Sequence, residues 1–252
     1  MIDPSIETEL RAVLDDVPPV NHAFGYGSGV LPQPLCDDEG PSASARDHAA
    51  TGSVVDFVFA VDDPRAWHRR NMTMNPSHYA PHLRALGGGT VAALADRVGA
   101  GVHYNTLIPW TKTSSSARLA PTTFKYGVVS VNAMCDDLVN WRHMFVAGRM
   151  QKPVVALGRP DPRVTAAQTI NARSALAAAL LLLPEEFSRE DLLASLCGLS
   201  YAGDVRVALG AEDVDKVRRI ATGSERELME MYRDAVKVVG SDLAGLTMGR
   251  GG

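Results

Sequence analysis

Short hydrophobic runs separated by polar or glycine-rich segments fill the first 160 residues, and this pattern is typical of an α/β protein. Residues 53–61 are rich in β-branched and aromatic side chains, which predicts a largely buried strand. Residues 102–108 and 124–130 have the same character and predict two more strands. A shorter apolar piece at 23–30 runs into a glycine-rich turn.

Apolar residues at helical spacing predict helices over about 6–14, 90–98 and 136–149, with the glycines at 87–89 as a flexible joint. Polar stretches at 34–51 and 112–122 predict surface loops. From about residue 165 to 233 the pattern is helical, and Ser188 begins a capping box with Asp191. We therefore predict an α/β (α+β) fold with an α/β half at 1–160 and a mostly helical half at 161–252.

The composition, with 46% hydrophobic and 21% charged residues, excludes a disordered chain or a disulfide scaffold. The formal net charge of −4 provides no general attraction for nucleic acid, so we expect no nucleic-acid partner. Three cysteines without a CxxC pair indicate a reducing compartment. The longest apolar run, 175–183, is shorter than the about 20 residues of a membrane span, and the acidic start resembles no targeting signal. These features predict a cytoplasmic protein with no targeting or transmembrane segment.

Gly25, Tyr26, Gly27, Ser28 and Gly29 form the sharpest local motif. Closely spaced glycines let backbone amides approach and cradle phosphate oxygens, and the serine hydroxyl adds a donor. The spacing matches neither a P-loop nor a dinucleotide-binding fingerprint, and an ordinary tight turn is the alternative.

Asp56 interrupts the apolar strand at 53–61. A buried carboxylate is costly unless it is paired or binds a cation, so the alternatives are an ion pair with a buried Arg or Lys and a Mg²⁺ site shared with substrate phosphates. Asp62 lies on the same face of the strand but about 20 Å further along. It can share a metal with Asp56 only if the strand bends or bulges; the alternative is an acid that simply ends the strand.

Lys125, Arg149 and Lys152 are the cations best placed to neutralise a triphosphate, and the alternative for the last two is an ordinary complement to a helix dipole. Histidines 68, 78 and 82 lack a convincing metal-ligand spacing, so we interpret them as structural.

A glycine–serine turn followed by a strand with carboxylates resembles the nucleotidyltransferase superfamily, the fold of DNA polymerase β. That superfamily usually has a second acid two residues after the first, where this chain has Val58. Eight ordered blocks between residues 23 and 207 resemble one family, the mitochondrial translocator-assembly-and-maintenance phosphatidate cytidylyltransferases. These blocks are GYGSGVLPQ, VDFVFAVDDPRAWH, NPSHY, GAGVHYNTLI, KYGVVS, DLVNW, VAGRMQKPV and LSYAGDVR.

The resemblance implies a nucleotidyltransferase domain with a mixed sheet, a winged-helix-like domain, and Mg²⁺-dependent synthesis of CDP-diacylglycerol and pyrophosphate from CTP and phosphatidic acid. It also implies peripheral action on a membrane face: the matrix side of the mitochondrial inner membrane in eukaryotes, and the inner face of the plasma membrane if this is a bacterial homologue. Residues 67–70 and 110–118 are candidates for lipid contact. The oligomeric state stays open, with a homo-oligomer among the alternatives.

In this interpretation Asp56 binds Mg²⁺, with Asp62 as a candidate second ligand. Gly25, Tyr26, Gly27 and Ser28 hold the nucleotide, and Lys125, Arg149 or Lys152 neutralise charge. Two other functions stay open: a nucleotidyltransferase with another acceptor, and a non-catalytic assembly factor that keeps the fold.

Overall fold

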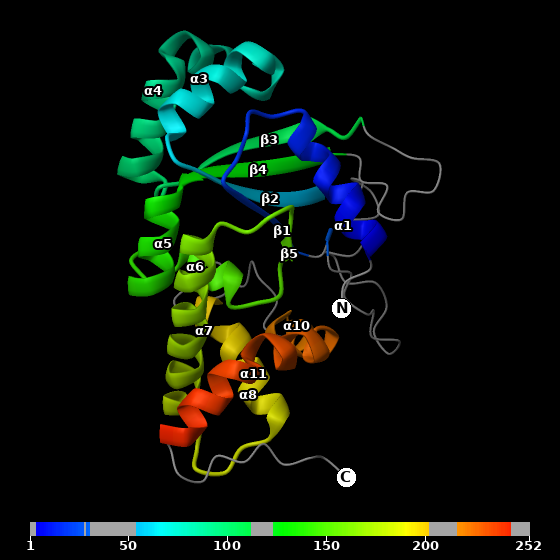
Figure 1. Ribbon diagram of the computed structural model, residues 1–252, viewed down its shortest axis with the longest axis vertical. Coiled ribbons are helices and arrows are strands. Elements are labelled where there is room, and N and C mark those ends of the chain that lie inside the picture. The colour runs from blue at the N-terminus through cyan, green and yellow to red at the C-terminus, as the bar shows by residue number, and fades with distance from the viewer. Residues whose placement is uncertain (1–3, 28, 31–53, 112–122, 202–215, 243–252) are drawn as a thin grey trace. The chain divides into compact units, whose positions relative to one another are not determined.

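The computed structural model describes residues 4–27, 29–30, 54–111, 123–201 and 216–242 (Figure 1). Both polar stretches that were predicted as surface loops lie outside this part of the chain. The chain divides into two compact units: unit 1 comprises residues 1–135 and 154–164, and unit 2 comprises residues 136–153 and 165–252.

Unit 1 is built on a five-stranded mixed sheet with the strand order β3-β4-β2-β1-β5 (Figure 1). β2 and β4 are parallel, and the other neighbouring strands are antiparallel. The bounds are β1 (His22–Tyr26), β2 (Val54–Val61), β3 (His103–Pro109), β4 (Thr123–Ser130) and β5 (Val155–Ala156). The sheet confirms the predicted α/β class and the three predicted strands, which are β2, β3 and β4. β1 occupies the apolar piece before the glycine-rich turn, which was not predicted as a strand. β5 was not predicted, because a strand of two residues is too short to show a periodic pattern.

β2 is the central strand, with β4 and β1 hydrogen-bonded to its two edges, and its residues from Phe57 to Val61 are buried. Val55, Phe57 and Phe59 point to one face, where they join a hydrophobic core with side chains of α1 (Pro4–Arg11), η1 (Ala12–Asp15) and α3 (Pro64–Met74). By the same alternation, Asp56 and Val58 belong to the opposite face.

A helical hairpin follows β2 directly. Asp63 caps α3 by accepting hydrogen bonds from the backbone N–H groups of Arg65 and Ala66. The short η2 (Pro76–His78) then leads to α4 (Pro81–Val98), which is interrupted at Gly87 by a backbone φ of 79°. The predicted helix at 90–98 is therefore the second part of a longer helix, and the glycine joint lies inside it.

The prediction of one helix over 136–149 is wrong, because two helices occupy this region: α5 (Val131–Asn140) and α6 (Phe145–Met150). Trp141 and Met144 adopt left-handed backbone conformations between them. The carboxylate of Asp137, only 4% exposed, accepts hydrogen bonds from the N–H groups of His143, Val146 and Ala147. This buried acid supplies the first N–H groups of α6 with an acceptor and so ends one helix and begins the next.

Unit 2 is helical throughout its described residues. Besides α6, it contains most of α7 (Pro162–Leu182), then α8 (Arg189–Gly198), η3 (Leu199–Tyr201), α10 (Lys216–Gly223) and α11 (Glu225–Asp242). Leu176, Leu192 and Leu228 are among the fully buried residues of its core. The capping box predicted at Ser188 and Asp191 is present at the start of α8. Among the described helices, none is both long and apolar enough to cross a membrane.

Candidate functional site

Asp56 and Lys125 are direct neighbours on the two parallel strands of the sheet. Their Cα atoms are partners in the β2–β4 register, and the Lys125 ammonium lies 3.1 Å from Oδ1 of Asp56. The side chains are 21% exposed for Asp56 and 37% exposed for Lys125. The ion pair that the sequence offered as an alternative is therefore present. Oδ1 of Asp56 is itself buried, but the two side chains are otherwise partly exposed. A charged ligand can reach this pair without unfolding the sheet.

The glycine-rich turn lies next to the Asp56 carboxylate. Tyr26 is the Cα partner of Asp56, and Gly27 follows it with a φ of 83°, a conformation that favours glycine. A Cβ atom at Gly27 would lie 3.5 Å from Oδ2 of Asp56. The turn closes with a 3.1 Å hydrogen bond from Val30 N–H to the Gly27 carbonyl. The phosphate interpretation requires that the backbone of the glycine turn lies close to the Asp56 carboxylate, and the structure has this geometry.

Two other members of the motif have different positions. Gly25 lies inside β1, paired with Phe57 on one side and Val155 on the other, so it belongs to the sheet and not to the turn. Ser28 lies outside the described residues. A Cβ atom at Gly29 would collide with the carbonyl oxygen of Val54, so this glycine permits the turn to pack directly against the start of β2.

Tyr104 joins this face and was missed by the sequence reasoning. Its Cα partner is Gly127 on β4, and a Cβ atom at Gly127 would lie only 2.7 Å from Cζ of the Tyr104 ring. The ring therefore lies flat over Gly127. Its hydroxyl is 3.0 Å from the hydroxyl of Tyr26, so the two tyrosines bridge the face on which Asp56 lies. The sequence signal is weak: a glycine within a strand often permits such a close approach.

Asp62 lies apart from Asp56. The β2–β4 register runs without a shift from Val54 to Val61, so the bend or bulge that a shared metal would require is absent. Asp62 instead accepts hydrogen bonds from Arg163 at 2.9 Å and from Asn21 at 2.8 Å. These hydrogen bonds, Arg163 first, lower the pKa of its carboxyl group. Asp62 is therefore left out of the site that we propose below.

Arg149 and Lys152 belong to unit 2, and both donate a hydrogen bond to a backbone carbonyl of α6. Arg149 Nη1 donates to the Phe145 carbonyl at 2.6 Å, and Lys152 Nζ donates to the Gly148 carbonyl at 2.8 Å. Lys152 also donates to Ser200 Oγ at 2.5 Å. A cation that bonds a carbonyl in the last turn of a helix complements its dipole, so the geometry of Lys152 matches the structural alternative. Arg149 bonds the carbonyl of the first residue of α6, and its guanidinium carbon lies 3.7 Å from the centroid of the Phe145 ring. Their contact with a nucleotide stays a prediction.

Of the three histidines that were interpreted as structural, His68 and His78 form part of a polar network in unit 1, whereas His82 is exposed. His68 is fully buried, and its Nδ1 lies 2.8 Å from the Tyr79 hydroxyl. His78 Nδ1 lies 2.9 Å from the hydroxyl of Tyr126, and Asn71 donates to both tyrosines. Desolvation, with a smaller contribution from the nearby His103, lowers the pKa of His68 to about 3. The described residues contain no group of three or more His, Cys, Asp or Glu side chains arranged to hold a metal ion.

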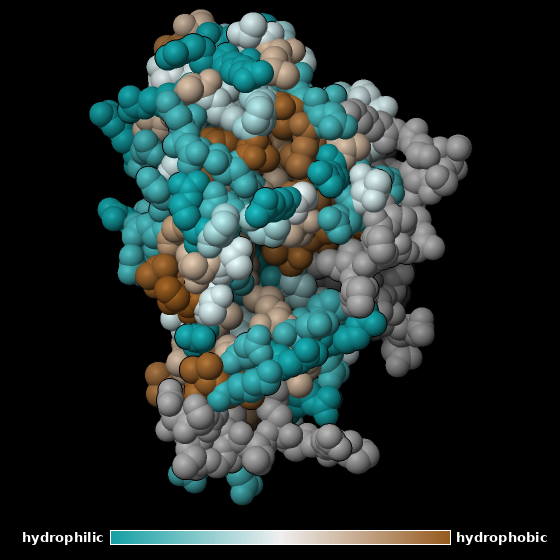
Figure 2. Space-filling view, viewed as in Figure 1, coloured by the Kyte–Doolittle hydropathy of each residue, from teal (hydrophilic) through white to brown (hydrophobic). Residues whose placement is uncertain are grey.

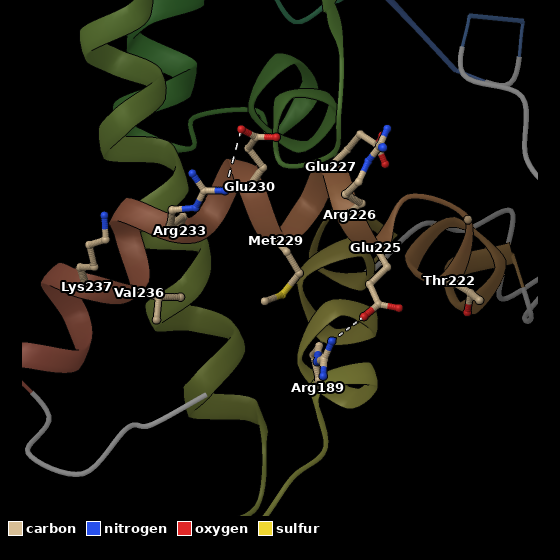
Figure 3. A pocket seen from close by; sticks show the side chains of 11 residues that line it. Arg189, Thr222, Glu225, Arg226, Glu227, Met229, Glu230, Arg233, Val236 and Lys237 are labelled. Atoms are coloured by element: carbon tan, nitrogen blue, oxygen red, sulfur yellow. Dashed lines mark hydrogen bonds and ion pairs between the residues drawn. The ribbon is translucent and has the colours of Figure 1, made fainter. Parts of the chain in front are cut away.

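A groove of about 830 Å³ in unit 2 lies between α10, α11 and the start of α8 (Figure 3). Its charged side chains are paired with one another: Arg189 lies 2.9 Å from Glu225, Arg226 lies 2.8 Å from Glu227, and Arg233 lies 3.9 Å from Glu230. It contains none of the predicted site residues, and its charges are already compensated. We therefore place the candidate site at Asp56.

An α/β protein with an exposed aspartate–lysine pair beside a glycine turn is suited to bind a polyphosphate. Comparison with known proteins identifies the family. A family model described as "Phosphatidate cytidylyltransferase, mitochondrial" matches residues 10–245, and the chain belongs to this family.

The chain is similar to several curated proteins called phosphatidate cytidylyltransferase, mitochondrial. It is 42% identical to the one from Xenopus laevis over 226 residues, which cover 89% of this chain and 61% of the relative. It is 41% identical to the human protein over 224 residues, covering 88% and 45% respectively. The Drosophila melanogaster protein is 40% identical over 219 residues, covering 86% and 61%. The chain thus spans between 45% and 61% of the length of these relatives.

Proposed function

We propose that this chain is a phosphatidate cytidylyltransferase that transfers CMP from CTP to phosphatidic acid. A phosphate oxygen of phosphatidic acid attacks the α-phosphorus of CTP. The bond to the bridging oxygen of the β-phosphate breaks, and CDP-diacylglycerol and pyrophosphate are formed. Membership of the family and the names of its relatives support this reaction.

The observation that carries the proposal is the Asp56–Lys125 pair beside Gly27. The attacking phosphate is already an anion, so the reaction needs little help from a general base. Its obstacle is repulsion between two anions, and fixed positive charge together with in-line positioning lowers that obstacle. Lys125 supplies a positive charge, and the backbone at Gly27 passes close beside the carboxylate with which Lys125 is paired.

The residues present also fit a magnesium ion. Oδ2 of Asp56 lies on the side of the carboxylate next to Gly27. A carboxylate oxygen is the donor type that Mg²⁺ prefers. Mg²⁺ commonly uses one or two carboxylates and completes its shell with water and substrate phosphates. A single aspartate is therefore sufficient on the protein side. When bound, Mg²⁺ would neutralise charge on the triphosphate.

We further propose that unit 1 is a nucleotidyltransferase domain of the polymerase β kind and that the helices of unit 2 form a winged-helix-like domain. The order of the strands and the position of Asp56 on the central strand support the first assignment. Phosphatidic acid is a bilayer lipid, so we propose peripheral action on a membrane surface. Location at the inner face of a bacterial plasma membrane, and a homo-oligomeric state, stay predictions.

The test is an assay of purified protein with CTP, Mg²⁺ and phosphatidic acid, with CDP-diacylglycerol and pyrophosphate both measured. We expect the two products in equal amounts and little reaction with ATP, GTP or UTP. Asp56→Asn keeps the shape of the side chain and removes its charge, so we expect a loss of at least about a hundredfold in kcat/KM. Asp234→Asn on α11, an 88% exposed acid, is the matched control and keeps wild-type rates.

Two results would contradict the proposal. Pyrophosphate release that requires a different acceptor would identify another nucleotidyltransferase. Absence of transfer by a folded protein, with every nucleotide and with phosphatidic acid present, would favour the assembly-factor alternative. A rise in melting temperature on addition of CTP separates these outcomes from a protein that fails to bind nucleotide.

A further inference from the structure

The helical hairpin formed by α3, η2 and α4, residues 64–98, has a charge opposite to that of the whole chain. It contains five arginines and one acid, Asp96, which gives a formal charge of +4 in a chain of −4. The remaining residues therefore carry −8. The arginines are Arg65, Arg69, Arg70, Arg84 and Arg97, and all five are exposed.

Among the described residues these arginines have no acidic partner, whereas several surface cations of unit 2 do. Within the described part of the chain, none of the five forms an ion pair. On α11, by contrast, Arg226 is paired with Glu227 and Lys237 with Asp234. Uncompensated positive charge on an exposed surface attracts an anionic partner.

The two helices form one tightly packed element. A Cβ atom at Gly88 on α4 would lie 2.5 Å from the backbone nitrogen of Arg69 and 3.0 Å from the carbonyl oxygen of Arg65. Glycine at this position therefore lets the two backbones touch. On α3 the exposed positions repeat at helical spacing, and Arg65, Arg69 and Thr73 are exposed residues one turn apart.

Exposed apolar side chains accompany the arginines. Leu94 and Val98 are one turn apart on α4 and are 48% and 78% exposed, next to Arg97. Met74 at the end of α3 and Leu86 are 47% and 58% exposed. Figure 2 shows hydrophilic and hydrophobic residues interspersed over this end of unit 1. Arginine beside exposed aliphatic side chains is typical of surfaces that lie in the headgroup region of a bilayer.

We propose that the hairpin of residues 64–98 is a docking surface for a bilayer that contains anionic lipids. The choice of a lipid surface over nucleic acid rests on the exposed aliphatic side chains and on the proposed lipid substrate. Trp67, a candidate for lipid contact in the sequence, is only 5% exposed and donates a hydrogen bond to the Pro18 carbonyl. Trp67 therefore belongs to the core. Of the segment 67–70, only Arg69 and Arg70 are exposed for lipid contact.

The hairpin positions unit 1 at the bilayer without being part of the reaction site. Pro64 follows Asp56 by eight residues, so the start of the hairpin is within roughly 25 Å of the carboxylate at strand rise. Docking should therefore raise the rate of reaction with phosphatidic acid embedded in a vesicle, and it should not affect the rate with a water-soluble substrate that has the same headgroup.

The experiment is flotation of the purified full chain with phosphatidylcholine vesicles, with and without phosphatidylglycerol. The variant Arg69→Gln/Arg70→Gln/Arg84→Gln removes three unpaired charges. The matched control Arg226→Gln/Arg233→Gln/Lys237→Gln removes three paired ones. We expect wild type and control to bind only the anionic vesicles and the hairpin variant to bind them at least about tenfold more weakly. Leu94→Ser/Val98→Ser should weaken binding as well, with melting temperatures verifying that every variant is folded.

Equal binding of the hairpin variant and the control, or wild-type binding that is the same for neutral vesicles, overturns the proposal. Binding of the hairpin to duplex DNA or RNA, with no vesicle binding, overturns it in favour of a nucleic-acid partner. An assay with water-soluble, short-chain phosphatidic acid separates this proposal from the proposed function. The hairpin variant should use that substrate at the wild-type rate and lose activity only on vesicles. If no protein uses either substrate, the proposed reaction fails while the vesicle result still decides the docking surface.

Discussion

The ammonium group of Lys125 lies 3.1 Å from the carboxylate of Asp56, on two parallel strands whose registers bring these residues side by side. A pair of this kind can stabilise the fold or bind a ligand. Lys125 is 37% exposed, and exposed ion pairs contribute at most about 1 kcal/mol to stability. Asp56 is only 21% exposed, so the loss of its partner carries a further cost. The partly exposed ammonium group is well placed to bind a ligand.

Replacement of the lysine distinguishes the two roles. In Lys125→Met we expect kcat/KM for CTP to fall by roughly a hundredfold or more, because a fixed positive charge near the phosphates is lost. The melting temperature should fall only modestly. Steady-state kinetics and thermal unfolding of the same preparation provide the measurement. A large drop in melting temperature with retained activity would show that the pair is structural.

The Tyr26–Tyr104 bridge can be tested by removal of single hydroxyl groups. Tyr104→Phe and Tyr26→Phe should each lower the free energy of unfolding by about 1 kcal/mol, the value of a typical hydrogen bond. The double variant should lose less than the sum of the two, because both changes remove the same interaction. Denaturant unfolding of the four proteins gives this coupling, and strictly additive losses would show that the hydroxyls do not interact.

Gly127→Ala tests the position of the Tyr104 ring. The added methyl group would lie 2.7 Å from Cζ of Tyr104 and 2.7 Å from Cγ1 of Val102, so the ring must move. We expect a loss of about 1–3 kcal/mol in stability, the usual cost of overpacking. We also expect a fall in cytidylyl transfer larger than that of Tyr104→Phe, which keeps the ring in place. Equal rates for the alanine variant and wild type would remove this ring from the site.

The buried His68 predicts a dependence of stability on pH. Its pKa in the folded protein is about 3, well below the 6.5 of an unperturbed histidine, so the unfolded chain binds the proton more readily. The stabilising contribution of the neutral ring is therefore complete above about pH 6.5 and is lost as the pH falls toward 3. Between pH 7 and pH 5 this group should remove about 2 kcal/mol of stability.

The measurement is the free energy of unfolding between pH 7 and pH 5 for wild type and two variants. His68→Asn should be less stable at pH 7 but lose less stability on acidification, because its side chain does not titrate. His82→Asn is the control at an exposed position and should follow the wild-type curve. If the unfolding free energy of His68→Asn falls with pH as steeply as that of wild type, other groups cause the acid sensitivity.

Asp137 predicts the largest loss of stability from a single carboxylate in unit 2. Its replacement by Ala leaves the N–H groups of His143, Val146 and Ala147 without their acceptor, so we expect a cost of about 2–4 kcal/mol. Asp136→Ala removes the neighbouring, 40% exposed carboxylate and should cost less than about 1 kcal/mol. Comparable losses for the two variants, measured by chemical denaturation, would contradict the capping role.

Several features were readable from the sequence because their signals are local. The β-branched run of β2, the capping box at Ser188 and the break at Gly87 each depend on a few adjacent residues. Asp56 was predicted as a site residue for the same reason, since a carboxylate within an apolar strand is conspicuous wherever the strand lies, and its role in a site stays a prediction. The family resemblance was also readable, because its blocks are contiguous.

The tertiary structure decided the rest. Alternation along a strand determines which face a side chain belongs to, but not which strand lies beside it or in which register. The pairing of Asp56 with Lys125, and the contact of Tyr104 with Tyr26 over Gly127, join residues about 70 or more positions apart and follow only from the strand order. The unshifted register separates Asp62 from Asp56, and a buried Asp137 divides one apparent helix into two. Hydrophobic pattern determines which segments are strands and helices, whereas packing between distant segments determines which polar groups meet.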